Sequence, residues 1–80
     1  MGKRMAYRKR RVLLRKGVEI IEEGRVKDDN GRYYPEGYCV DFNYCGWKVS
    51  APGNDMLEAY NGALFAAKIC GEEPYGGRED

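Results

Sequence analysis

Residues 38–44 read Tyr-Cys-Val-Asp-Phe-Asn-Tyr, and aromatic or apolar side chains alternate with polar or small ones. Successive side chains of a β-strand point to opposite faces of the sheet, so this alternation predicts a strand with one buried face. The buried face would carry Tyr38, Val40, Phe42 and Tyr44, and the opposite face would carry Cys39, Asp41 and Asn43.

The residues that follow this strand predict a β-hairpin. A Cys-Gly pair at residues 45–46 permits a tight turn into residues 47–50, where Trp47 and Val49 again share one face. Ala-Pro-Gly at residues 51–53 is expected to end the second strand, because proline cannot donate a hydrogen bond to a strand ladder.

The residues before the central strand predict a further strand and a reversal. Residues 18–27 mix β-branched residues with acids, which favours a strand. Asp-Asp-Asn-Gly at residues 28–31 is a strong turn signal. Residues 32–34 are strand-like again until Pro-Glu-Gly at residues 35–37 interrupts them.

Residues 55–70 carry apolar side chains at helical spacing, which predicts a C-terminal helix. Asp55 can cap its first turn, with Glu58 three residues later completing a capping box. Gly71 stands where a C-cap glycine belongs. Gly62 lies in a stripe of small residues, which suggests that the helix approaches the sheet closely.

The segment at residues 7–16 fits two structures. Arg-Val-Leu-Leu at residues 11–14 favours a strand that turns into residues 18–21, and a basic helix that ends at Gly17 is the alternative. We favour the strand.

The predicted fold is therefore α+β, with an antiparallel sheet of three to four strands packed against one C-terminal helix. Residues 1–11 would form a basic N-terminal arm, residues 12–71 a single small domain, and residues 72–80 a flexible C-terminal tail.

Positive charge is concentrated at the N-terminus. Eight of the fourteen Lys and Arg residues lie within the first sixteen positions, which contain no acid, although the net charge of the whole chain is only +1. A crowded positive end attracts a polyanion, so the first hypothesis is a non-enzymatic module that contacts the phosphate backbone of DNA or RNA. The alternatives are a protein partner and a solvated terminus with no partner. The predicted nucleic-acid-binding residues are Lys3, Arg4, Tyr7, Arg8, Lys9, Arg10, Arg11, Arg15 and Lys16.

A second hypothesis uses the acidic body or the aromatic residues as a protein interface. A small inhibitor or accessory protein of this kind would bind a nucleic-acid-handling protein complex, with carboxylates on one face in place of phosphates. The predicted interface residues are Glu22, Glu23, Asp28, Asp29, Tyr33 and Tyr34.

A basic start followed by three strands and a C-terminal helix is similar in order to the arm-type DNA-binding domains of tyrosine integrases, which lay a sheet in the major groove. The size and compactness of the predicted domain also resemble small phage-encoded inhibitors of bacterial defence complexes, such as anti-CRISPR proteins. The first resemblance implies DNA binding and the second an anti-defence role, and neither assigns a site residue to this chain.

Other functional classes have little support in the sequence. There is no histidine to act as a base near neutral pH and no Gly-rich phosphate loop before the helix, so we expect neither an enzyme nor a cofactor. Three widely spaced cysteines fit neither a disulfide framework nor a four-ligand zinc site, so no metal is expected. No apolar run suits a membrane span or a signal peptide, which predicts a cytoplasmic protein. A core of about sixty residues is small, and a homodimer or a bound partner would stabilise it.

Overall fold

The computed structural model describes residues 2–27 and 30–73. Its elements in chain order are α1 (Gly2–Lys16), β1 (Glu19–Lys27), β2 (Tyr33–Tyr44), β3 (Trp47–Gly53) and α2 (Met56–Glu72).

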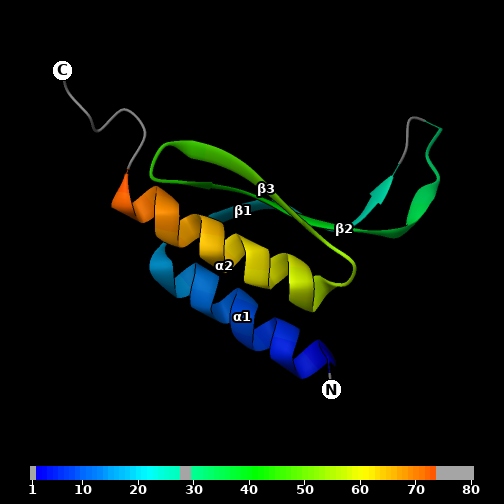
Figure 1. Cartoon of the computed structure of the whole chain (residues 1–80), viewed down its shortest axis with the longest axis horizontal. Helices are drawn as coiled ribbons and strands as arrows, with labels where there is room; N and C mark the ends of the chain where they lie inside the picture. Colours follow the sequence, from blue (N-terminus) through cyan, green and yellow to red (C-terminus); the bar gives the residue numbers. More distant parts are fainter. Residues whose placement is uncertain (1, 28–29, 74–80) are drawn as a thin grey trace.

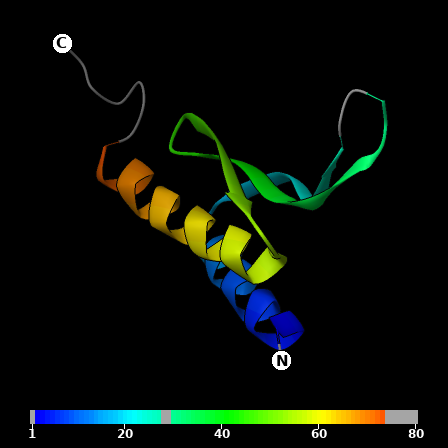
Figure 2. The same ribbon diagram turned by 45° about the vertical axis from the view of Figure 1, so that its right-hand side comes forward.

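The strands form one antiparallel sheet in the order β1-β2-β3, and both helices lie on the same side of it (Figure 1). The helices lie side by side and run in the same direction, as the turned view also shows (Figure 2). The predicted α+β class is confirmed, whereas the expectation of a single C-terminal helix is wrong. Because a helix precedes the first strand, the element order also differs from the one that resembled the integrase domains.

The N-terminal basic segment is a helix, so the favoured strand is wrong and the helical alternative is correct. Ala6 and Leu13 lie two turns apart on one side of α1 and are 9% and 0% exposed, so the helix has a buried side. Gly17, with a φ of 97°, ends the helix in the left-handed region. Its N–H donates to the Leu14 carbonyl at 3.1 Å, and the Val18 N–H donates to the Leu13 carbonyl at 3.2 Å. These two bonds form a Schellman motif, and the buried Val18 and Leu13 supply its apolar contact.

The chain reverses between β1 and β2 as predicted, and the two strands pair in antiparallel register. The expected interruption at residues 35–37 does not end a strand, because β2 is continuous through it. Arg25 pairs with Tyr38 and Lys27 pairs with Tyr33, so β2 has three more residues than β1 between these two pairs. The Pro-Glu-Gly segment therefore disturbs the pairing of the strands without breaking β2.

The predicted hairpin of β2 and β3 is confirmed. Tyr44 pairs with Trp47 across a two-residue turn in which Cys45 has a φ of 52° and Gly46 a φ of 85°. Positive φ at both central positions is the pattern of a type I′ turn, whose twist matches that of the flanking strands. Val40 and Phe42 are fully buried, as the alternation of the central strand predicts.

Both outer strands of the sheet carry an irregular residue. β3 ends at Gly53, within the predicted segment, but it includes all three residues of that segment. Pro52 pairs with Cys39, because proline is accepted on an edge strand. On β1, Ile21 is an extra residue between two regular pairs, and it is 58% exposed.

The predicted cap at Asp55 is confirmed, because Asp55 accepts a hydrogen bond from the Glu58 N–H at 2.8 Å. The Glu58 carboxylate accepts a hydrogen bond at 2.6 Å from the Asn54 N–H, one residue before the cap, and not from the Asp55 N–H of the predicted capping box. The predicted C-cap at Gly71 is wrong, because α2 continues to Glu72 and its C-cap is Glu73.

The core lies between the two helices and the sheet. Alanines at every fourth position of α2 face it, which lets the helix lie close to its neighbours. The buried cluster comprises Ala6, Leu13, Val18, Val40, Phe42, Ala51, Ala59, Tyr60, Ala63 and Ala67.

Gly53 and Gly62 lie near the contact between α2 and the sheet, and they differ in how much space is left for a side chain. A Cβ atom added at Gly53 would lie 2.9 Å from the Cα of Ala59, inside the first turn of α2. A Cβ added at Gly62 would meet the Ala51 Cβ at 3.7 Å, which is an ordinary contact. α2 does approach the sheet closely at Gly62, but the approach does not require a glycine.

We predict opposite effects of the same substitution at these two positions. Gly53→Ala should lower the free energy of unfolding by about 1–3 kcal/mol, because the backbone of α2 must move away. Gly62→Ala should raise it by up to about 1 kcal/mol, because alanine favours the helix. Urea unfolding followed by circular dichroism measures both, and equal shifts in the same direction would contradict the packing described above.

Candidate nucleic-acid interface

Four exposed arginines share the outward side of α1. They are Arg4, Arg8, Arg11 and Arg15, and together we call them the arginine face. Their spacing of four, three and four residues places them within an arc of about 60° that extends about 16 Å along the helix. This arc lies opposite the buried side of α1. No acidic side chain among the described residues forms an ion pair with any of the four.

The other predicted residues of α1 surround the arginine face or turn away from it. Tyr7 is 67% exposed and lies beside the face, and Lys16 is exposed at the end of the helix. Lys9 is half-buried, and Arg10 points toward β1. The side chain of Lys3 lies outside the described residues.

Arg10 joins a three-residue junction with Glu23 of β1 and Tyr60 of α2. The Arg10 Nε donates to both Glu23 carboxylate oxygens at 3.0 Å, and its Nη2 lies 2.9 Å from Oε2. The Tyr60 hydroxyl donates to Oε1 of the same carboxylate. The hydrogen bond from Arg10 holds the pKa of Glu23 below its usual value, and burial raises the pKa of Tyr60. Arg10 and Glu23 therefore both stay charged at neutral pH. The Glu23 carboxylate connects β1 to α1 and α2.

Of the predicted protein-interface residues, the structure describes the side chains of Glu22 and Glu23, and these lie on opposite faces of the sheet. Glu23 pairs with Val40 and faces the helices, whereas the exposed Glu22 pairs with Asp41 and faces away from them. Asp28 and Asp29, and the side chains of Tyr33 and Tyr34, lie outside the described residues.

The sheet face away from the helices, here called the open face, carries more acidic than basic side chains. Exposed Glu19 and Glu22 lie on it with half-buried Asp41, and the exposed Lys48 lies on it opposite Asn43. The Asp41 carboxylate accepts hydrogen bonds from the Ser50 hydroxyl at 2.7 Å and the Cys39 thiol at 3.2 Å. Burial, with the neighbouring carboxylate, raises the pKa of Cys39 to about 11, so its thiol stays protonated near neutral pH. Among the described residues, no group of three or more potential metal ligands comes together.

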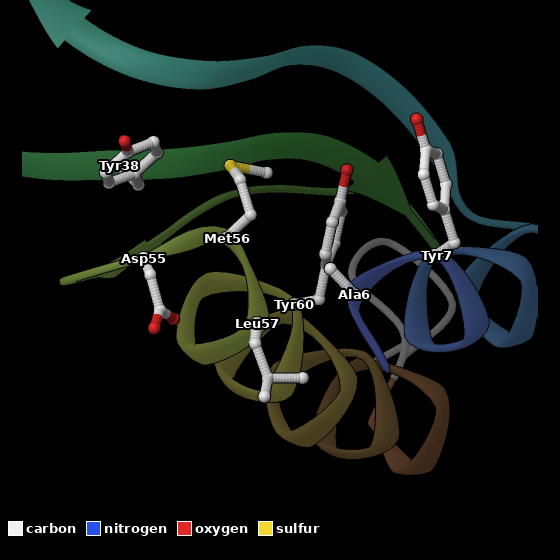
Figure 3. Close-up of a pocket in the computed structure, with 7 residues that line it drawn as sticks. All are labelled: Ala6, Tyr7, Tyr38, Asp55, Met56, Leu57 and Tyr60. Carbon is white, nitrogen blue, oxygen red and sulfur yellow. The ribbon is translucent and has the colours of Figure 1, made fainter. Parts of the chain in front are cut away.

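A cavity of about 490 Å³ opens where the N-terminal ends of both helices meet β2. Tyr7 and Tyr60 extend toward the sheet from α1 and α2, and Met56 lies between Tyr60 and Tyr38 (Figure 3). Asp55 and Leu57 extend to the other side, and Ala6 completes the lining. We call this cavity the tyrosine pocket. The sequence placed Tyr7 beside the basic residues, but nothing in the local pattern indicated that Tyr38 and Tyr60 would join it from distant segments.

Comparison with models of protein families, with curated proteins and with solved structures found no match to this chain. In the described part of the chain, neither helix has the length and apolar character needed to span a bilayer.

We predict that the junction makes stability depend on pH in the acidic range. Because the native pKa of Glu23 is lowered, its contribution is complete above the unfolded value of about 4.3 and is lost as pH falls through the native value. Glu23→Gln should therefore cost about 1–2 kcal/mol of unfolding free energy at pH 7.

The difference between the two proteins should shrink below about pH 4.3. Urea midpoints at several pH values measure this. A difference that is zero at pH 7, or constant down to strong acid, would contradict a charged junction.

Proposed function

We propose that this chain is a non-enzymatic nucleic-acid-binding module that contacts phosphates through the arginine face. The observation that carries the proposal is the line of four exposed arginines opposite the buried side of α1. Because the core fixes which side of α1 faces outward, these cations are presented together rather than scattered around a mobile arm.

The chemistry of arginine suits this role. Its planar guanidinium binds phosphate oxygens in a two-pronged geometry that lysine cannot reproduce. A face about 16 Å long extends past several successive phosphates of one strand. Each phosphate that is neutralised releases counterions, so the affinity should fall steeply as salt concentration rises.

The acidic open face supports one orientation of binding. It lies on the far side of the sheet from the helices, so a polyanion is attracted to α1 and repelled from the open face. The cysteines Cys39, Cys45 and Cys70 are free, which fits our proposal that the module acts in the reducing cytosol.

We predict that Arg8→Gln with Arg15→Gln weakens binding to any nucleic acid and flattens its salt dependence. Losing two contacts should make the log–log slope on duplex DNA shallower by about 1.8. Fluorescence anisotropy with a labelled duplex between about 50 and 200 mM NaCl measures the slope.

The matched control is Lys48→Gln with Lys68→Gln, which removes the same charge from exposed positions on β3 and α2. The control should leave the slope nearly unchanged. Equal loss in both variants would indicate a general charge effect and would reject the arginine face as the site.

The acidic residues of the open face favour a second candidate function, which is inhibition of a nucleic-acid-handling protein. Glu19, Glu22 and Asp41 share the open face, which is the one-sided acidic arrangement that a phosphate-mimicking inhibitor requires. In this version the chain is an anti-defence or accessory protein that occupies the basic groove of a nucleic-acid-handling complex.

For this candidate we predict that Glu22→Lys reduces capture of such a complex from a host lysate at least tenfold. Glu72→Lys, on the exposed side of α2, is the control with the same charge change and should capture normally. Quantitative pull-down compares the two, and undiminished capture by Glu22→Lys would reject the open face as the interface.

A further inference from the structure

The tyrosine pocket lies directly beside the arginine face. Tyr7 belongs to both, because it lines the pocket from α1 and is separated by three residues from Arg4 and by four from Arg11. Side chains at these separations are neighbours on a helix surface, with Cβ atoms about 5–6 Å apart. A group bound against Tyr7 would therefore have guanidinium groups within reach on one side.

The lining of the pocket suits a flat aromatic group. Three of the seven tyrosines of the chain line it, together with Met56 and Leu57. Its volume of about 490 Å³ lies within the range of small-ligand sites. Tyrosine rings and a thioether both make favourable contacts with aromatic faces.

The side of the pocket that faces the sheet is lined by aromatic rings and a thioether. The Asp55 carboxylate extends to the other side and caps α2 by accepting the Glu58 N–H, so it does not face a ring bound against Tyr7 and Tyr60. The Tyr60 hydroxyl is held by Glu23 and fixes that ring in place. The site thus offers cations for phosphates at the arginine face and aromatic rings for a flat group in the pocket.

We propose that the tyrosine pocket takes an unpaired nucleobase, so that the module binds single-stranded nucleic acid in preference to duplex. This inference rests on the proposed nucleic-acid function and names its substrate class. A base stacked in a duplex cannot enter a pocket without leaving its partner, whereas a single strand offers free bases at little cost. A positively charged track beside aromatic stacking groups is the general arrangement of single-strand binders.

The test compares three labelled 12-mers by anisotropy at low salt: dT12, the dT12–dA12 duplex, and a strand of abasic sites with the same phosphates. Wild-type protein should bind dT12 more tightly than either of the others. Tyr7→Ala should weaken dT12 binding by about 5- to 150-fold, because aromatic stacking is lost, and should change binding of the abasic strand less than twofold. Tyr7→Trp should retain the preference.

Phe65→Ala is the matched control, because Phe65 is 69% exposed on α2 and Tyr7 is 67% exposed on α1. It should bind all three probes as the wild type does. Adding dT12 to labelled protein should also shift the backbone amide NMR signals of Met56, Leu57 and Tyr60, which lie in the pocket and outside the arginine face. Replacing dT12 with rU12 determines whether DNA or RNA is preferred.

Two results would overturn the inference in different ways. If all three probes bind equally and Tyr7→Ala behaves like Phe65→Ala, the pocket takes no base, while the arginine face still binds phosphate. If none of the probes binds at low salt, the proposed function fails together with the inference that depends on it.

Discussion

The carboxylate of Glu23 is the contact on which the arrangement of this small protein depends. It accepts hydrogen bonds from Arg10 of α1 and Tyr60 of α2 while its backbone belongs to β1, so a single side chain connects both helices to the sheet. Ala6 and Leu13 are buried on the same side of α1, and the two kinds of contact together fix the rotation of the helix about its axis. The Glu23 carboxylate stays ionised at this half-buried position because the hydrogen bonds from Arg10 and Tyr60 both lower its pKa.

Fixing that rotation separates the charges of a nearly neutral chain. One strongly basic helix surface faces outward on one side of the molecule, and the carboxylates of the open face lie on the other. The core between them is built largely from alanines and a few large residues, of which Phe42 and Leu13 are fully buried.

Local patterns in the sequence were sufficient to predict the hairpin, the cap at Asp55 and the α+β class, because each follows from neighbours in the chain. The N-terminal helix was missed because Val12 and Leu14 suggest a strand, although both are partly exposed. The spacing of the four arginines opposite Ala6 and Leu13 fits an amphipathic helix, and this pattern could have predicted α1. The sequence predicted the basic residues as one set. It did not show that four of them form the arginine face while Arg10 turns inward to bind Glu23. The tyrosine pocket could not be predicted, because its walls come from segments that only tertiary packing brings together.

The irregular residues on the two outer strands limit how copies of this chain can associate. Exposed sheet edges offer unpaired backbone groups to which another strand can add, and proteins commonly block them with bulges or proline. Here Ile21 forms a bulge in β1 and Pro52 lies in β3, so the strand at each edge of the sheet is irregular. Addition of a strand from a second molecule is therefore disfavoured at either edge of this sheet.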